Sequence, residues 1–523
     1  MLFNIFGNRK KKRDEWIKNA TRDVNSAPED HVFTGKLRED LAFLTELFKD
    51  VDILRVRELE NRNDKKLRFC LLYCDGMVDS LLLSQTVVGP LVDARIEPGG
   101  GGELADTVLK ETIYVGEGKK TRDLKHVIDA ITYGDTALLI DGSKDVLLLN
   151  TKGFHTRAID EPDSEKTLNG PREGFNESIM QNLSLVRRKL GTPALKMKFL
   201  SMGKQSNTRV CVCYLEGIVN KDVLKELYRR LERIDIDAIL DSNYISELIR
   251  DAPYSPFRTT GYTEKPDVVV GKILEGRIVL FVDGTCNVIT LPYLFIENFQ
   301  SGEDYYLSFF YTSVSRLLRI IGFFATVITP GLYIAVVAFH REMLPQALLI
   351  NIAAERMNVP LPAALEALVM LVVFDILRET GVRMPSSIGQ ALSIVGALVI
   401  GQAAVEAKLV SSPMIIVVGF TGITNLLVPK MNAPIIYLRL AILALSSLFG
   451  FLGLLIGVLV SVIHILNLKS FGVPQVSNIG NLRYQAVKDS AFRAPWWDML
   501  TRPRVLTKNS TRMRVKDGGP NDA

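Results

Sequence analysis

Five polar residues that could act on ions lie within or beside apolar stretches of the C-terminal half. They are Glu366, Asp375, Gln402, Glu406 and Arg439. An ionisable side chain at membrane depth is costly, so such a residue marks an ion path by default. Two simpler interpretations compete with this one. Asp375 pairs with Arg378 along a single helix, or Glu406 and Arg439 lie at helix ends and extend to the lipid headgroups.

Catalytic and metal-binding patterns are missing from the sequence. There is no Gly-x-Ser-x-Gly or His-Glu-x-x-His motif, and the five histidines are scattered. The five cysteines lack zinc-finger spacing, so we expect buried, reduced thiols. We therefore expect no enzyme, no metal and no cofactor. A net charge of +5 is too modest to indicate nucleic-acid binding, and basic residues at membrane ends account for much of it.

The apolar stretch 387–405 has two different faces. One is a stripe of small residues at every fourth position: Gly389, Ser393, Ala397 and Gly401. Such stripes let helix backbones approach closely in lipid. The opposite face, at 100° per residue, carries Val395, Val399, Gln402 and Glu406. We expect the small stripe to pack on neighbouring helices and the other face to line a pore in a homo-oligomer. In the alternative, the two valines face lipid.

Charge and hydropathy divide the chain into a soluble half and a membrane half. Charged residues crowd the first three hundred positions, and apolar runs crowd positions 317–466. We expect an α/β fold followed by a transmembrane helical domain. The expected parts are a basic tail (1–29), two α/β subdomains (30–159 and 168–300), a helical membrane domain (317–466) and a basic cytoplasmic tail (467–523).

The two α/β subdomains are predicted from an internal repeat. Residues 67–78 match residues 208–219, with identical Arg, Cys, Tyr, Gly and Val positions. A second match pairs Gly134, Asp141 and Gly142 with Gly276, Asp283 and Gly284 at nearly the same offset. A strand, an Asp-Gly turn and another strand form a β-hairpin. Two matches in register indicate a duplication of one α/β unit.

Five apolar segments are expected in the membrane domain. They are residues 317–339, 361–377, 387–405, 414–428 and 435–466. The soluble half lacks an export signal and the C-terminal tail is basic, so we expect both on the cytoplasmic side. An even number of crossings then requires one re-entrant segment. Segment 361–377 is preferred over 414–428 because it contains acidic residues.

Several motifs occur together and in a fixed order. They are GPREGFNE (170–177), EKPD (264–267), LEGR (274–277), FQSGEDYY (299–306), VFDILRETGVRMP (373–385), SIVGALVIGQAAVEAKLVS (393–411) and PWW (495–497). As a set, over residues 168–504, they resemble the A subunits of spore germination nutrient receptors, the GerA family. The chain departs from the usual family pattern at Leu371 and Asp375, where Glu is common.

The resemblance implies a membrane subunit of a nutrient-gated receptor in the spore inner membrane. It implies an oligomer that passes ions, with a transporter-like B subunit and a lipoprotein C subunit as partners. Two other functions stay open. One is a non-conducting scaffold, such as a sporulation paralogue, and the other is a secondary transporter. The transporter is less favoured because no inverted repeat is visible in the membrane half.

Overall fold

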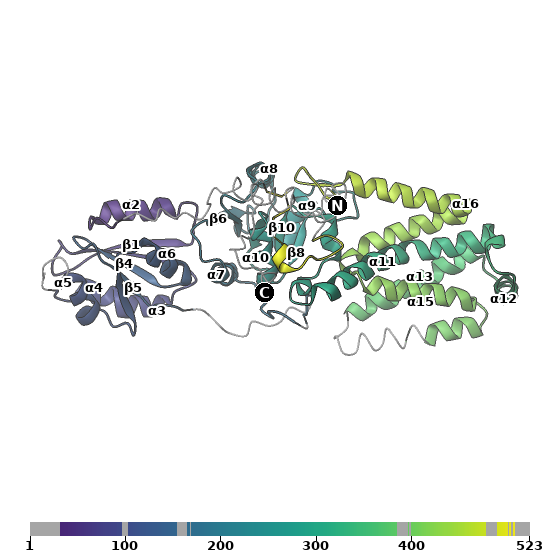
Figure 1. The fold of residues 1–523 in the computed structure, drawn as a ribbon, viewed down its shortest axis with the longest axis horizontal. Coiled ribbons are helices and arrows are strands. Elements are labelled where there is room, and N and C mark those ends of the chain that lie inside the picture. Colours follow the sequence, from purple (N-terminus) through teal and green to yellow (C-terminus); the bar gives the residue numbers. More distant parts are fainter. Residues whose placement is uncertain are drawn as a thin grey trace, which may run out of the picture.

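The computed structural model describes residues 32–96, 103–153, 165–167, 169–383, 396, 399–476, 489–499, 501–503 and 506–507. Two α/β units lie in series along the long axis, and a bundle of helices follows them (Figure 1). The expected basic N-terminal tail lies outside the described residues.

The first α/β unit contains an antiparallel sheet with the strand order β1-β2-β4-β5-β3. Its strands are β1 (Leu54–Glu60), β2 (Arg68–Cys74), β3 (Gly118–Thr121), β4 (Thr136–Ile140) and β5 (Val146–Leu149). One face packs against α2 (Leu37–Leu47) and α6 (Leu124–Tyr133). The other is covered by α3 (Ser80–Leu82), η1 (Leu83–Val88), α4 (Gly89–Asp93), α5 (Glu103–Thr107) and η2 (Val108–Thr112).

The second unit repeats this topology with the strand order β6-β7-β9-β10-β8. Its strands are β6 (Leu195–Met202), β7 (Thr208–Leu215), β8 (Gly261–Thr263), β9 (Ile278–Val282) and β10 (Val288–Leu291). Helices α7 (Ile179–Lys189) and α10 (Pro266–Leu274) cover one face. Helices α8 (Lys221–Leu231) and α9 (Ser242–Ile249) cover the other.

The matched residues of the sequence repeat occupy equivalent positions. The Asp-Gly turns place Gly142 and Gly284 at φ values of 86° and 85°, a left-handed conformation that favours glycine. Each aspartate then binds the first helix of its own unit. Asp141 accepts from the backbone N–H of Leu37 at 3.3 Å, and Asp283 accepts from that of Ile179 at 3.2 Å. The turn and the helix start are therefore fixed together in both units.

The two units share one hydrophobic core. The apolar faces of α2, α6, α7 and α10 pack together between the sheets. Cys70, Cys74, Cys211 and Cys213 are buried there as free thiols, as expected from their spacing. Burial raises the pKa of Cys213 to about 12, so this thiol stays protonated at neutral pH.

The helical bundle begins with α11 (Phe309–Ile334), which contains Pro330 and continues as η5 (Ala335–Phe339). It then contains η6 (Arg341–Met343), α12 (Gln346–Arg356), α13 (Ala363–Arg383), a helix at residues 399–406, α15 (Ser412–Leu426), η7 (Pro429–Met431) and α16 (Asn432–Asn467). Helix α12 lies at the end farthest from the α/β units (Figure 1). Among the described residues, two stretches are long and apolar enough to cross a membrane by length and composition, Phe309–Phe339 and Pro429–Asn467.

Helix α16 is a hairpin, which corrects the expectation of one long tilted helix over 435–466. Gly450 has φ 60° and ψ −133°, a backbone conformation that breaks the helix. A Cβ on Gly453 would lie 2.0 Å from the carbonyl oxygen of Leu445, so the chain folds back on itself. Each arm has roughly 17 residues, which is about 26 Å of helix.

Helix α13 is longer than the segment expected at 361–377, and its re-entrant placement stays a prediction. It is one continuous helix of 21 residues and packs against α15 and α16. The glycine contacts fix the direction of the next helix. Gly396 lies beside Leu377, near the end of α13, whereas Ser411 contacts Glu366 near its start. The described residues from Gly396 to Ser411 therefore run antiparallel to α13.

The chain after the bundle returns to the second α/β unit. Strands β11 (Lys469–Ser470) and β12 (Val473–Pro474) form a small ribbon, and Phe471, Val473 and Leu506 join the core beneath α8 and α9. Short 3₁₀ turns η3 (Phe295–Phe299), η4 (Gly302–Tyr305) and η8 (Trp496–Asp498) complete the junction. The C-terminal segment is thus on the same side of the bundle as both sheets.

Candidate functional site

Two of the charged residues predicted to act on ions pair with each other across helices. Arg439 in α16 donates from Nη2 to Asp375 Oδ2 in α13 at 2.5 Å, and Arg439 is fully buried. Arg439 therefore does not extend outward in this structure, and Asp375 pairs across helices while the charge of Arg378 on its own helix also acts on it. A buried charge is tolerated when it is paired and hydrogen-bonded.

Glu366 is also fully buried and holds the turn before α15. Its Oε1 atom accepts from the backbone N–H of Ser411 at 2.6 Å and from Ser411 Oγ at 2.5 Å. Ser411 is the residue that precedes α15, so the carboxylate lies at the positive end of that helix dipole. This contact joins the start of α13 to the start of α15.

Further polar side chains are buried between the same helices. Thr326 donates to Thr424 Oγ1 at 2.8 Å, which joins α11 to α15. The side-chain amide of Asn425 and the hydroxyl of Ser446 are buried without a hydrogen-bond partner among the described residues. We did not predict these four residues. Ser, Thr and Asn inside an apolar run are the signal that would have found them, because they mark helix interfaces in lipid.

The expected pore helix has two faces in its described part. Gly401 is buried, and a Cβ there would lie 3.6 Å from the Ile415 side chain of α15. Val399, Gln402 and Glu406 are exposed in the single chain, and Gln402 donates to Glu406 Oε1 at 3.0 Å. The remaining candidates, Gly389, Ser393, Val395 and Ala397, lie outside the described residues.

A buried network of charges joins the second α/β unit to the bundle. Arg316 in α11 is fully buried and donates to Asp304 and to Asp489, at 2.8 Å each. Arg319 donates to the same Asp304 at 3.0 Å. Tyr305 donates from its hydroxyl to Asp489 at 2.8 Å. The base of α11 is therefore tied to both the preceding turn and the C-terminal segment.

A second network lies at the end of α10. Glu297 accepts from Arg277 and from Lys272 at 2.5 Å each, and both arginine and carboxylate are buried. Burial by itself would raise the pKa of Glu297, but the charges of Arg277 and Lys272 outweigh it, and the pKa lies below its usual value. Among the described residues, no group of His, Cys, Asp or Glu side chains could hold a metal ion.

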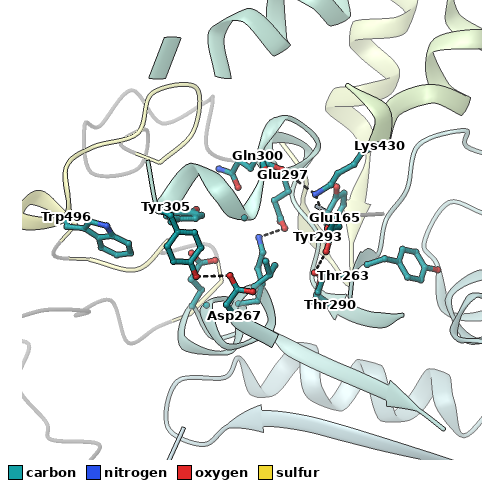
Figure 2. Close-up of a pocket in the computed structure, with 18 residues that line it drawn as sticks. Glu165, Thr263, Asp267, Thr290, Tyr293, Glu297, Gln300, Tyr305, Lys430 and Trp496 are labelled. Carbon is teal, nitrogen blue, oxygen red and sulfur yellow. Dashed lines mark hydrogen bonds and ion pairs between the residues drawn. The ribbon is translucent and has the colours of Figure 1, made fainter. Parts of the chain in front are cut away.

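Between the two networks lies a cavity of about 310 Å³ (Figure 2). It is formed by α10, the 300–306 segment, Lys430 before α16, and Trp496 of the C-terminal segment. Its walls contain residues of the EKPD, LEGR, FQSGEDYY and PWW motifs, which are far apart in the sequence. The motifs that seemed unrelated in the sequence thus meet at one junction.

Comparison with known proteins identifies the family. The profile of the Bacillus/Clostridium GerA spore germination protein family matches residues 42–505. This chain belongs to the GerA family. It is 39% identical to the spore germination protein KA of Bacillus subtilis (strain 168) over 471 residues, covering 90% of this chain and 86% of that protein. The expectation drawn from the sequence motifs is confirmed at the level of the family.

Other relatives extend the comparison. The spore germination protein GerLA of Bacillus cereus is 32% identical over 92% of this chain and 99% of its own length. The uncharacterized membrane protein YfkQ of Bacillus subtilis is 37% identical over 94% of this chain and 96% of its own length. A crystal structure of the N-terminal domain of the A subunit of the Bacillus megaterium spore germinant receptor GerK3 covers 51% of this chain and 98% of that domain. Its identity is 29% and its TM-score 0.39.

Proposed function

We propose that this GerA-family chain is the membrane subunit of a spore nutrient receptor and forms an ion channel as a homo-oligomer. The observation that carries the proposal is the two-sided helix at 399–406. Gly401 packs on α15, while Val399, Gln402 and Glu406 stay exposed on the single chain. Valine rings can gate by dewetting, and carboxylates at a pore mouth attract cations.

The fold supports a multi-pass arrangement for this proposal. The helical segments alternate in direction, and Glu366 and the Asp375–Arg439 pair lie inside the chain's own bundle. These three residues therefore stabilise the helix packing in the proposal, and the exposed face of 399–406 contributes the pore. The location would be the spore inner membrane, with the α/β units on the cytoplasmic side.

We also propose a receptor complex with a transporter-like B-type subunit and a lipoprotein C-type subunit. Support comes from family membership, since the relatives include proteins named for spore germination. A second candidate function is a non-conducting scaffold. Family membership is compatible with this function too, because the relatives include the uncharacterized membrane protein YfkQ at 37% identity.

Ion flux separates the two functions. The full chain would be purified, its subunit number determined in detergent, and the oligomer reconstituted into liposomes that contain an ion-sensitive dye. Because the proposed channel is closed at rest by its valine face, flux is measured for Val399→Ala, which widens that face, and for the double variant Val399→Ala/Glu406→Lys at matched assembly. A channel gives a flux in Val399→Ala whose cation preference falls in the double variant. Assembled protein that is impermeable in every form supports the scaffold.

A further inference from the structure

A second cavity lies at the end of the helical bundle that is farthest from the α/β units. Its volume is about 550 Å³, and its walls come from η5, the turn that follows it, and α12. Arg341 and Arg356 are the charged residues of this wall, and the other described residues that line it are apolar. No acidic side chain is among them, so the cavity has an excess of positive charge.

Both arginines are available to a ligand. Arg341 is exposed, and its Nε atom donates to the carbonyl oxygen of Val337 at 3.1 Å, which holds the side chain beside η5. Arg356 is partly buried, and neither arginine forms an ion pair with a described residue. The acids beside them in the sequence lie outside the wall. Glu342 is exposed, and Glu355 accepts from Ser412 Oγ at 3.1 Å.

The cavity lies where a membrane-spanning stretch ends. Helix α11 and η5 together form the apolar stretch Phe309–Phe339, and Arg341 follows it closely. Helix α12 lies at the tip of the bundle, on the side opposite the α/β units (Figure 1). Arginines at the end of a span keep their charged heads at the level of the lipid headgroups. This placement rests on the membrane arrangement of the proposed function.

The wall combines two chemistries. Guanidinium groups bind phosphate oxygens through paired N–H bonds, so two arginines favour an anionic phosphate. The apolar part includes Ile350 and Met357, which are 61% and 86% exposed and would gain by being covered. A free phosphate ion would leave this apolar surface bare. A phosphate ester that carries acyl chains matches both parts of the wall.

We propose that this cavity binds one anionic phospholipid of the leaflet opposite the α/β units. Its phosphate lies on Arg341 and Arg356, and one acyl chain lies along the apolar residues of α12. Because the wall comes from both η5 and α12, the bound lipid joins the end of α11 to the helix that follows it.

Three variants separate the two parts of the wall. Arg341→Gln and Arg356→Gln each remove one positive charge. Ala353→Phe keeps both charges and fills the cavity from the exposed face of α12. Lys408→Gln is the matched control. It removes one exposed positive charge at the same end of the bundle, just before the start of α15, and Lys408 is not part of the wall.

The experiment is native mass spectrometry of the full chain in a neutral detergent. The probes are phosphatidylglycerol and phosphatidylcholine with the same acyl chains, and inorganic phosphate and glycerol phosphate are the competitors. We expect one phosphatidylglycerol per chain, bound about tenfold more tightly than phosphatidylcholine and not displaced by either competitor at equal concentration. Each arginine variant should weaken binding about tenfold. Ala353→Phe should also weaken it, and Lys408→Gln should leave it unchanged.

Four results would overturn the proposal. They are equal binding of the two lipids, displacement by free phosphate at equal concentration, an equal loss in Lys408→Gln and the arginine variants, and cavity variants that bind like the wild type. Lipid binding needs no open pore. An absence of ion flux would therefore contradict the proposed channel and leave this measurement intact.

Discussion

Arg439 and Asp375 form an ion pair between α16 and α13, with the arginine fully excluded from solvent. Two of its guanidinium nitrogens, Nε and Nη1, have no partner among the described residues. The Asp375 carboxylate is therefore the main electrostatic partner of the buried Arg439 guanidinium. Removing either residue would leave the charge of the other unpaired inside the bundle.

Removing one partner of this pair should be far more harmful than removing both. Arg439→Met is expected to lower the free energy of unfolding by about 3–5 kcal/mol, because Asp375 is left unpaired. The double variant Arg439→Met/Asp375→Leu should recover most of the loss. The exposed pair Arg383–Glu379 provides a control, and Arg383→Met should cost about 0.5 kcal/mol or less. Thermal unfolding in detergent measures the stability of Arg439→Met, the double variant and Arg383→Met. Equal losses of stability in Arg439→Met and in the double variant would contradict a buried ion pair between Arg439 and Asp375.

The hairpin in α16 makes a separate prediction about Gly450. An alanine there would adopt a positive φ, and its Cβ would lie 2.8 Å from the Phe339 ring. We expect Gly450→Ala to destabilise the bundle by at least about 1–3 kcal/mol. Gly419→Ala in α15 is the control, since a Cβ there meets nothing within 4 Å and alanine favours a helix. If α16 were one straight helix, both substitutions would be neutral or stabilising.

Glu297 should make stability depend on pH. Its pKa is below the usual value of 4.5, so the folded state binds this proton less readily than the unfolded chain. The stabilisation is therefore complete above about pH 4.5 and is lost as the pH falls through the lower, folded-state pKa. The loss of stability caused by Glu297→Gln should be largest at pH 7 and should shrink toward pH 3. Unfolding curves for both proteins at several pH values test this. A difference that does not change with pH would show that the carboxylate charge is irrelevant.

Glu406 is expected to influence ion selectivity. Its carboxylate is exposed at the end of the 399–406 helix, where it would line a pore mouth in the proposed oligomer. In the leaky Val399→Ala background, Glu406→Lys should lower the ratio of cation to anion permeability in liposomes, because it reverses the charge at the entrance. Glu379→Lys at the exposed end of α13 is the matched control and should leave the ratio unchanged. Equal ratios in all three proteins would remove Glu406 from the pore.

The α/β half could be predicted well from the sequence because its signals are local. The Asp-Gly turns at 141–142 and 283–284 determine the hairpins, which can be read from a few adjacent residues. The contact of each aspartate with the first helix of its unit spans 104 positions and could not be read in this way. The hairpin in α16 could not be predicted in this way. The stretch 435–466 is almost uniformly apolar, and glycines are common in membrane helices, so Gly450 gives no distinct signal.

The contacts between the second α/β unit and the helical bundle could not be predicted from the sequence either, for a different reason. Its contacts join residues such as Arg316 and Asp489, which are separated by 173 positions, and only the folded chain brings them together. The 387–405 stretch, by contrast, has a pattern that can be read from adjacent residues. Its two-sided pattern was visible in the sequence. In the described part Gly401 is buried and Val399 is exposed, and a pore at the exposed face stays a prediction.

The central claim is that Val399 faces a closed pore, and one flux measurement tests it directly. Val399→Ala is compared with Val314→Ala, because both valines are 58% exposed on the single chain and Val314 lies on α11. Both variants are first shown to assemble as the wild type does and are then reconstituted into liposomes. A wider, wetted constriction in Val399→Ala should give ion leak without nutrient, while Val314→Ala stays closed. A silent Val399→Ala in assembled protein, or an equal leak from both variants, would contradict the pore.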